Sequence, residues 1–293
     1  MLHRKVKILI GLAFPVGAAW SLAKKGFLVI PIPFRPYSRV GFSVNNAPFI
    51  FKIFVNFFRV RVATWGGRIY IQLRQFKGQV TYFEDGFYRS EGHWKNVRIP
   101  ERVAYEHGAP YFLNSQDSRL TKAIESSECF DLPKVKKMAL SEFNAITSGR
   151  GKYGRFASGF SGKPTPEKVV ALQDGMDSQI TLSKNYKSLY PIFKEYINTH
   201  PVSAIRGHPN NVNKSLLSGS FSDLKSNGVK NLVVYNSTSG LEAIINGIPV
   251  TYYGDSPVLR ILDYENLVLP VTIIPTEEVV WRLTLAFYVI YPI

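Results

Sequence analysis

The chain has 293 residues, of which 45% are hydrophobic, 14% aromatic and 19% charged. This composition excludes a disordered protein, and the length suits two domains of about 100–200 residues each. A net charge of +15 indicates an anionic partner: a nucleic acid, an acidic membrane surface, or a phosphorylated or carboxylated substrate. The single cysteine, Cys129, excludes an intrachain disulfide and a Cys-rich metal site and favours a reducing compartment.

The N-terminus places basic residues before an apolar run from Ile8 to Trp20, an arrangement that imitates a signal peptide. The run is too short to span a bilayer, which takes about 20 apolar residues. We interpret residues 6–11 as the first buried strand of an α/β domain, and this interpretation predicts a cytoplasmic protein. Residues 26–34 form a second apolar run, whose two prolines predict an edge strand or a loop.

The segment 47–58 is rich in phenylalanine and other apolar residues, interrupted only by Lys52 and Asn56. This pattern indicates either a helix buried on nearly all sides or an interfacial patch. We favour the buried helix because interfacial helices normally carry a clean polar face. Residues 69–76 are then predicted to form a short helix and residues 78–83 a strand.

The stretch Glu84-Asp85-Gly86, with Arg89 close behind, is the first candidate site. In open α/β sheets ligands bind just beyond the carboxyl ends of the strands, where we expect both carboxylates. Adjacent positions of an extended chain address opposite faces, so one carboxylate is expected to do chemistry and the other to serve the scaffold. The residues alone leave open an Asp-Gly turn with Arg89 as a surface ion-pair partner.

Residues 89–109 are predicted to form a polar loop and residues 117–127 a helix. Glycine, serine and basic residues are frequent in 145–166. We place the domain boundary there, between a first domain of residues 1–155 and a second of residues 166–293.

The second half alternates strand and helix patterns, which predicts right-handed crossovers and a parallel sheet. Apolar residues at helical spacing predict helices over 186–197, begun or kinked by Pro191, and over 241–246. The predicted strands are 168–172, 202–206, 231–235 and 249–253.

Polar residues follow three of these strands, and together they predict a nucleotide-sized crevice at one edge of the sheet. They are the loop from Gln173 through Asp177 to Gln179, then His208-Pro209, then Ser237-Thr238-Ser239. A lone histidine such as His208 is otherwise a packed or surface residue.

The serine-rich segment begins a predicted helix, where free backbone N–H groups favour a phosphate. Ser239 and Glu242 also have the S-x-x-E spacing of a capping box, which is the structural alternative. The phosphate site and the capping box are compatible if the hydroxyls contact a phosphate while Glu242 caps the helix or accepts hydrogen bonds from ribose hydroxyls.

Several motifs are absent from the sequence. It has no G-x-x-x-x-G-K-[ST], G-x-G-x-x-G or G-x-S-x-G, so P-loop hydrolysis, dinucleotide redox chemistry and nucleophile-elbow hydrolysis lose their main support. Metal-ligand spacing is absent too, and we predict no metal site. Because no zinc-finger, RNA-binding or long basic-helix signature occurs, we predict no nucleic-acid partner.

These motifs in their order resemble the bacterial capsule-polysaccharide synthesis proteins of the KpsC/KpsS type, retaining β-Kdo glycosyltransferases that use CMP-Kdo. The resemblance extends over residues 60–258 and departs from the family where Glu91-Gly92-His93 replaces the usual Gly-Leu-Gly. It rests on Trp65-Gly66, Glu84-Asp85-Gly86-Phe87-Tyr88-Arg89-Ser90, Leu172-Gln173 with Asp177-Ser178-Gln179, His208-Pro209, Ser237-Thr238-Ser239-Gly240-Leu241-Glu242-Ala243, and Gly247-Ile248-Pro249-Val250.

The resemblance implies a GT-B-like α/β architecture, in which two Rossmann-like domains face each other across a cleft. Asp85 would attack the anomeric carbon, Arg89 suits the Kdo carboxylate by its charge, and Glu84 is assigned to the scaffold. Retention also needs an acid/base group, for which Glu91 and Glu106 are candidates. The expected nucleotide contacts are Gln173, Asp177, His208, Pro209, Ser237, Thr238, Ser239 and Glu242.

The predicted protein is a cytoplasmic glycosyltransferase, peripheral to the inner membrane, that moves Kdo or a related 2-keto sugar acid from CMP to an anionic glycan or lipid-linked acceptor. CMP-Kdo is its donor substrate, and no permanently bound cofactor is expected. The positive charge would attract the donor and hold the enzyme at an anionic inner leaflet. The alternatives are a non-catalytic polysaccharide-handling or export-coupling protein of the same fold, a basic nucleic-acid-associated protein, and an α/β domain of another function.

Overall fold

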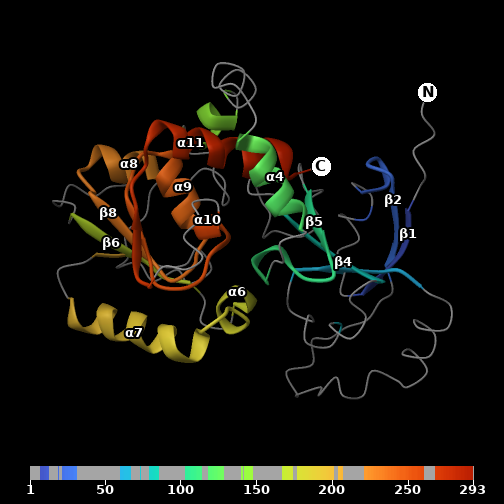
Figure 1. Ribbon diagram of the computed structural model, residues 1–293, viewed down its shortest axis with the longest axis horizontal. Helices are drawn as coiled ribbons and strands as arrows, with labels where there is room; N and C mark the ends of the chain where they lie inside the picture. The colour runs from blue at the N-terminus through green and yellow to red at the C-terminus, as the bar shows by residue number, and fades with distance from the viewer. Residues whose placement is uncertain are drawn as a thin grey trace. The chain divides into compact units, whose positions relative to one another are not determined.

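The chain folds as two compact units, each built around its own sheet of five described strands (Figure 1). The first unit comprises Met1–Gly86, Gly92–Arg119 and Pro292–Ile293, and the second comprises Phe87–Glu91 and Leu120–Tyr291. The computed structural model describes residues 7–12, 19, 22–31, 60–66, 73, 79–85, 103–113, 118–128, 140, 142–147, 167–173, 177–200, 204–206, 221–260 and 268–292.

The first sheet has the strand order β2-β1-β3-β4-β5. Its strands are β1 (Lys7–Leu12), β2 (Phe27–Pro31), β3 (Val62–Trp65), β4 (Val80–Asp85) and β5 (Val103–His107). The first four pair in parallel, whereas β5 is antiparallel to β4. The strands predicted at residues 6–11 and 78–83 are confirmed, and β2 lies at the edge of the sheet, where a proline does not interrupt a ladder.

Strand β5 corrects the prediction of a polar loop over residues 89–109. Only Val103 and Ala104 are adjacent apolar residues in this stretch, and Glu106 and His107 obscure the alternation in the sequence. Tertiary contacts favour the strand nevertheless, because the Tyr105 ring packs against those of Phe27 and Phe83, with centroids 5.1 and 5.7 Å apart. Packing of this kind decides strand formation more than local propensity does.

One hydrophobic core cluster of the first unit lies on one face of its sheet. The Phe83 ring is fully buried there and meets the Phe27 ring edge-on at 5.4 Å. Because side chains alternate along a strand, a slip of one residue in β4 would take Phe83 out of this core. The buried members are Leu9, Ala19, Leu22, Phe27, Val29, Ala63, Phe83 and Val103, with Trp65 and Tyr105 partly buried against them.

The second sheet has the strand order β10-β9-β8-β6-β7. Its strands are β6 (Lys168–Ala171), β7 (Ala204–Arg206), β8 (Asn231–Val234), β9 (Val250–Tyr252) and β10 (Val271–Ile273). Strands β6 to β9 pair in parallel and β10 is antiparallel to β9. The four strands predicted in the second half, and their parallel pairing, are confirmed.

Helices cover both faces of the second sheet (Figure 1). Helix α7 (Tyr186–Thr199) packs Phe193 against Val170, Val233 and Tyr235 of one face. Helices α8 (Phe221–Ser226), α9 (Ser239–Ile245) and α11 (Glu277–Thr284) lie on the other face. For α8 and α9 this is what right-handed crossovers require, because they lead to β8 and β9 in the opposite direction along the sheet from the step that α7 makes to β7. Pro191 lies inside α7 and does not begin it.

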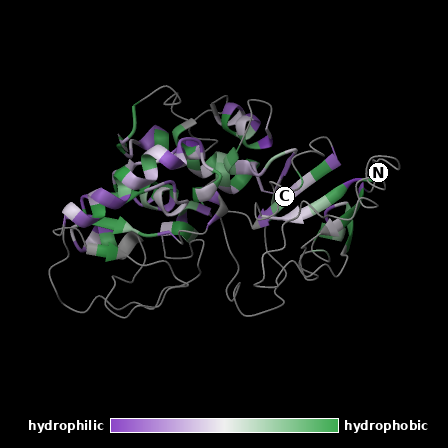
Figure 2. Cartoon of the chain, turned by 90° about the horizontal axis from the view of Figure 1, so that it is seen from below, coloured by the Kyte–Doolittle hydropathy of each residue, from purple (hydrophilic) through white to green (hydrophobic). Residues whose placement is uncertain are grey.

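The remaining described helices are short, apart from one. They are η3 (Tyr111–Leu113), α6 (Ser178–Thr181), α10 (Pro257–Arg260) and the π-helix η5 (Leu285–Ile290), together with the longer α4 (Arg119–Glu128). Helix α4 confirms the helix predicted at 117–127, and α9 confirms the one at 241–246. In Figure 2 purple and green bands alternate along the helices, as expected where one side of each is buried.

The two compact units divide at Arg119 and Leu120, earlier than the predicted boundary in 145–166. Ile146 is buried, and the Phe143 ring packs at a tilt against that of Trp281 in α11, with the ring centroids 4.9 Å apart. These contacts tie this part of the chain to the second unit. The Gly- and Ser-rich composition of 145–166 therefore does not coincide with the division. Packing contacts, rather than composition, decide which unit a segment joins.

Two of the predicted segments fall outside the described residues: the Phe-rich segment 47–58 and, except for Leu73, the helix at 69–76. Across the described parts of the chain, none of the helices has the length and apolar character needed to cross a membrane.

Candidate functional site

The carboxyl ends of β3 and β4 bring two of the predicted motifs together. Trp65 pairs in register with Phe83, and the N–H of Gly66 donates to the Phe83 carbonyl oxygen at 2.8 Å. Gly66 then adopts a φ of 68°, a left-handed conformation that favours glycine and turns the chain out of the sheet. The Trp65-Gly66 turn therefore lies beside the end of β4, where the acidic pair is found.

Glu84 and Asp85 are the last two residues of β4, not the first residues beyond it as predicted. They pair with Ala104 and Val103 of β5, a strand that the sequence did not predict, and this pairing extends the ladder past both. Because the backbone does not turn between them, the two positions belong to opposite faces of the sheet. This geometry supports different roles for the two residues. Gly86, Glu91 and Arg89 lie outside the described residues.

Glu106, a candidate acid/base group, is bonded to the first residue of helix α4. Its side chain is buried and accepts a hydrogen bond from the backbone N–H of Arg119 at 2.9 Å, at the start of α4. It pairs with Tyr82, three residues along β5 from the partner of Asp85. Three residues of a strand span about 10 Å. Glu106 therefore serves the N-terminus of α4 and is not assigned to the chemistry.

In the second unit, the carboxyl ends of the neighbouring strands β6 and β8 are joined by amide side chains. The Gln173 Nε2 donates to the Asn236 Oδ1 at 3.0 Å, and the backbone N–H of Asn236 donates to the Gln173 Oε1 at 3.2 Å. The Asn236 Nδ2 donates to the backbone carbonyl of Gln179 at 2.7 Å, in a buried position. These bonds fix the start and the end of the predicted loop to β8.

Asp177 shapes the end of the same loop. Its Oδ1 accepts from the backbone N–H of Gln179 at 2.9 Å, and its carbonyl accepts from Ile180 and Thr181 at 3.0 Å each. Asp177 thus directly precedes α6 and caps its N-terminus, a position that aspartate favours. Its carboxylate is engaged with this helix in the structure, so any nucleotide contact would add to that role.

The serine-rich segment follows Asn236 directly, at the start of α9. The Ser237 Oγ accepts from the backbone N–H of Ser239 at 3.1 Å and from the Ser239 Oγ at 2.7 Å. Thr238 and Ser239 are nearly buried, whereas Ser237 is half-buried. The hydroxyls therefore form a compact turn at the edge of the sheet, beside the Gln173–Asn236 pair.

The predicted capping box of Ser239 and Glu242 does not form. The residue before α9 is Thr238, which makes no side-chain capping bond, and Ser239 is already the first helical residue. Glu242 is only 4% exposed. The pKa of the Tyr288 phenol in η5 is raised first by the burial of the tyrosine and second by the charge of Glu242. Glu242 therefore lies in the interior of the second unit, so we leave it out of the nucleotide contacts proposed below.

Gly240 allows the close approach of β9 to the start of α9. A Cβ added at Gly240 would lie 2.3 Å from the Tyr252 Oη and 2.7 Å from the ring carbon that bears it. The Tyr252 side chain is fully buried, and burial raises the pKa of its phenol. Only glycine fits at this position without moving the tyrosine.

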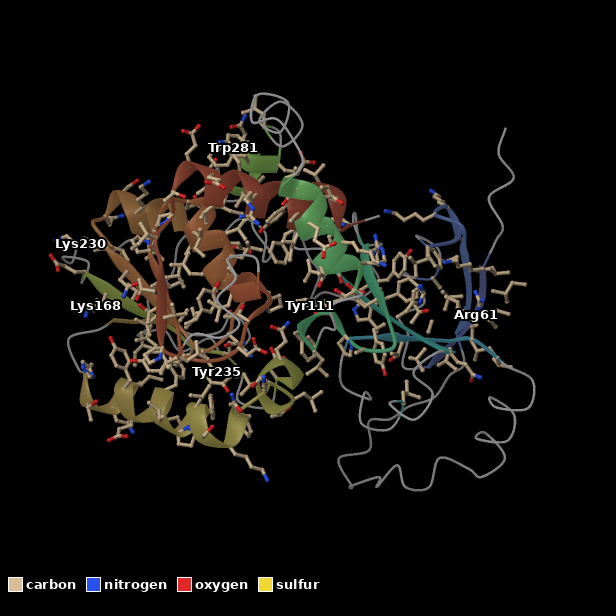
Figure 3. All side chains as sticks on the ribbon, in the orientation of Figure 1. Arg61, Tyr111, Lys168, Lys230, Tyr235 and Trp281 are labelled. Carbon is tan, nitrogen blue, oxygen red and sulfur yellow. The ribbon has the colours of Figure 1, made fainter. Side chains whose placement is uncertain are left out.

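Two participants were not singled out from the sequence. Asn236 is the hub of the amide network, and the Tyr235 Oη lies 3.1 Å from the Ser183 Oγ after α6. In Figure 3 Tyr235 lies away from Lys168 and Lys230, which mark the amino ends of β6 and β8. Tyr235 and Asn236 directly follow a buried strand and precede a serine cluster, and this position was the signal in the sequence that could have identified them.

His208 and Pro209 follow β7 and lie outside the described residues. Within the described residues, no group of three or more His, Cys, Asp or Glu side chains could hold a metal ion.

Comparison with solved structures shows a fold shared with two transferases from Thermosulfurimonas dismutans. The first, KpsC beta Kdo 2,7 transferase, is 19% identical, with a TM-score of 0.63 over 98% of this chain and 91% of that chain. The second, KpsC beta Kdo 2,4 transferase, is 16% identical, with a TM-score of 0.63 over 97% and 91%. No family model and no curated protein matches the sequence. The resemblance to KpsC-type proteins is thus confirmed at the level of the fold, as an α/β protein with two mainly parallel sheets.

Proposed function

We propose that this protein is a glycosyltransferase that moves Kdo, or a related 2-keto sugar acid, from a CMP donor to a glycan or lipid-linked acceptor. The observation that carries the proposal is the fold shared with two Kdo transferases over nearly the whole chain. The acidic pair at the carboxyl edge of the first sheet and the polar strand ends of the second sheet support it, since open α/β sheets bind ligands at such edges.

In this proposal the two units work as the two halves of a GT-B-like enzyme, and the second half binds CMP. The hydroxyls of Ser237, Thr238 and Ser239 would contact the phosphate, with Gln173 and Asp177 shaping the neighbouring loop. Supporting this assignment, the amide bonds between Gln173 and Asn236 hold that loop against the serine turn before any ligand arrives. His208 and Pro209 are assigned to the nucleotide from their place after β7.

Asp85 is proposed as the nucleophile of a retaining double displacement. One carboxylate oxygen would bond to the anomeric carbon while the bond from that carbon to the phosphate oxygen breaks, and CMP would leave with the electron pair. An acceptor hydroxyl would then attack the same carbon, lose its proton to a general base and release Asp85. Glu84, on the other face of β4, is assigned to the scaffold, and Arg89 to the carboxylate of the sugar.

The test is the intact mass of the full chain after mixing with CMP-Kdo. We expect a covalent adduct of one sugar residue, absent in Asp85→Ala and retained in the matched variant Glu84→Gln. Calorimetry with CMP should give the same affinity for Asp85→Ala as for the wild type, and a weaker one for His208→Ala.

Full turnover by Asp85→Ala would exclude this residue as the nucleophile. Tight CMP-Kdo binding without adduct, transfer or hydrolysis by the wild type would favour the non-catalytic alternative of the same fold.

A further inference from the structure

The chain leaves β6 and β8 towards opposite faces of the second sheet (Figure 1). From β6 it passes through α6 and α7 to β7, and from β8 it passes through α9 to β9. Because β7 and β9 lie on opposite sides of this pair, the carboxyl ends of β6 and β8 form the switch point at which open α/β sheets bind ligands. The serine turn, residues 237–239, lies on the α9 side of this point. The residues on the α7 side have no part in the proposed reaction.

Tyr235, which directly follows β8, is the centre of a polar and aromatic group on the α7 side. Its side chain is fully buried, with the Tyr190 ring edge-on at 5.1 Å, and its hydroxyl lies 3.1 Å from the Ser183 Oγ. The Tyr186 ring stacks on that of Tyr190 with the centroids 5.2 Å apart. Ser183 and Tyr186 are only partly buried. The buried Tyr235 therefore holds a hydroxyl and an aromatic ring that a ligand can reach.

Gly254 brings the turn after β9 against the Tyr235 ring. A Cβ added at Gly254 would lie 2.6 to 2.8 Å from three atoms of this ring, so only glycine allows the approach without moving the tyrosine. The Gly254 N–H also donates to the Tyr235 carbonyl at 2.7 Å. Asp255, the next residue, is partly buried and is thereby fixed at the same strand ends. The whole set, here named the Tyr235 group, consists of Ser183, Tyr186, Tyr190, Tyr235 and Asp255.

The titration of Tyr235 reflects these neighbours. Burial raises the pKa of its phenol above the ordinary value of 10.0, against the opposing effect of its hydrogen bond with Ser183. The charges of Tyr186, Asp255 and Tyr190 raise it further. Asp255 is therefore close enough for its charge to act on the phenol. The phenol stays protonated at neutral pH, so it remains a hydrogen-bond partner of Ser183.

We propose that the Tyr235 group binds the cytosine base of the CMP donor and that Asp255 selects cytosine over uracil. This inference rests on the proposed function and extends it to the choice of base. Tyr235 and Ser237 are two residues apart, so their Cα atoms lie within about 7 Å of each other. A nucleotide whose phosphate lies at the serine turn therefore reaches the α7 side of the switch point with its base.

The chemistry of the group fits cytosine. The exocyclic amine of cytosine donates hydrogen bonds that a carboxylate accepts, whereas uracil has a carbonyl oxygen at the same position. A carboxylate repels that oxygen, so Asp255 favours cytosine. Aromatic side chains stack on bases of every kind, and the Tyr186 ring adds affinity without selecting the base. The Ser183 hydroxyl, held by Tyr235, can donate to the carbonyl oxygen that both bases share.

Calorimetry of the full chain with CMP and with UMP tests the proposal. The wild type should bind CMP at least about tenfold more tightly than UMP, as expected for a hydrogen bond to a charged group. In Asp255→Asn the side-chain amide both donates and accepts, so the ratio of the two affinities should fall close to one. The matched control is Glu195→Gln, which removes an exposed carboxylate from the C-terminal half of α7 and should keep the wild-type ratio.

The stacking ring is tested separately. Tyr186→Leu should weaken the binding of CMP and of UMP alike, by about tenfold, because the stacking surface is removed. Tyr196→Leu makes the same change near the C-terminal end of α7, at another partly buried position, and should leave both affinities unchanged. Equal losses in the two variants would overturn the stacking role of Tyr186.

The affinity ratio separates selection of the base from a structural role. If Asp255→Asn keeps the wild-type ratio, whether or not both affinities fall, or if the wild type binds CMP and UMP equally, Asp255 does not select the base. A covalent adduct with CMP-Kdo would then still leave the proposed function standing. Loss of the ratio in Asp255→Asn supports the base site even where no adduct forms. Failure of the wild type to bind CMP would overturn both the base site and the proposed donor.

Discussion

The two sheet edges proposed to bind donor and sugar are held in place by different interactions. In the first unit, backbone pairing with β5 fixes Glu84 and Asp85, and the core ring of Phe83 sets the register. In the second unit, side-chain amides join the strand ends, with Asn236 as their hub. The first edge therefore depends on its hydrophobic core, whereas the second depends on a few buried polar bonds. Substitutions can separate these two kinds of support.

The largest effect is expected for Phe83→Ala, which removes the central ring of the first core. The loss should be about 3–5 kcal/mol of unfolding free energy, from lost burial and the remaining cavity. Urea unfolding followed by tryptophan fluorescence measures it. Leu232→Ala, at a fully buried position of the second sheet, is the matched change for the other unit. A loss below about 1 kcal/mol for Phe83→Ala would contradict a register set by this core.

Asn236→Ala is expected to cost about 2–3 kcal/mol, because the buried carbonyl of Gln179 and the amide of Gln173 lose their partner. It should also weaken CMP binding in calorimetry by loosening the 173–179 loop. Ser188→Ala, which removes an exposed hydroxyl bonded to the Asn185 carbonyl, is the control. Unchanged stability with unchanged CMP affinity would show that the amides do not support this edge.

Gly240→Ala is expected to cost about 1–3 kcal/mol, since the new methyl group overlaps the Tyr252 side chain. Thermal unfolding measures the loss. In the double variant with Tyr252→Phe, the nearest overlapping atom is removed, and part of the stability should return. If the double variant is as unstable as the sum of the single variants, the close approach of β9 to α9 is not the cause.

The smallest effect concerns pH and the first unit. The pKa of His107 is lower in the folded protein than its ordinary value of 6.5, chiefly through desolvation. Protons therefore bind the unfolded chain more readily, so this contribution to stability is present above about pH 6.5 and is lost as the pH falls below it. Thermal midpoints of His107→Gln should fall less than those of the wild type between about pH 8 and pH 5.5. Equal slopes would contradict the lowered pKa.

Local pattern predicted most of the strands that form the two edges. Residues 231–235 read as a buried strand because their run of apolar residues is flanked by polar turns, and β8 is that strand. The same reasoning failed for β5, whose Glu106 and His107 face α4 and solvent and hide the alternation. Asn236 was not predicted as a site residue because an amide residue after a strand is common. Its importance comes from its hydrogen bonds to Gln173 and Gln179, which only the folded structure brings close to it.

By itself, the sequence determined that the chain is a two-part α/β protein with acidic and polar residues at its strand ends, because hydrophobic periodicity and turn residues are local properties. The KpsC-like fold also followed from the order of its motifs, and the solved structures confirm it. Only the tertiary structure decided that β5 carries the ladder past Glu84 and Asp85, that Glu242 is buried, and that Asn236 joins the ends of β6 and β8. These features depend on contacts such as Asp85 with Val103, 18 residues apart, and Gln173 with Asn236, 63 residues apart, which no local pattern encodes.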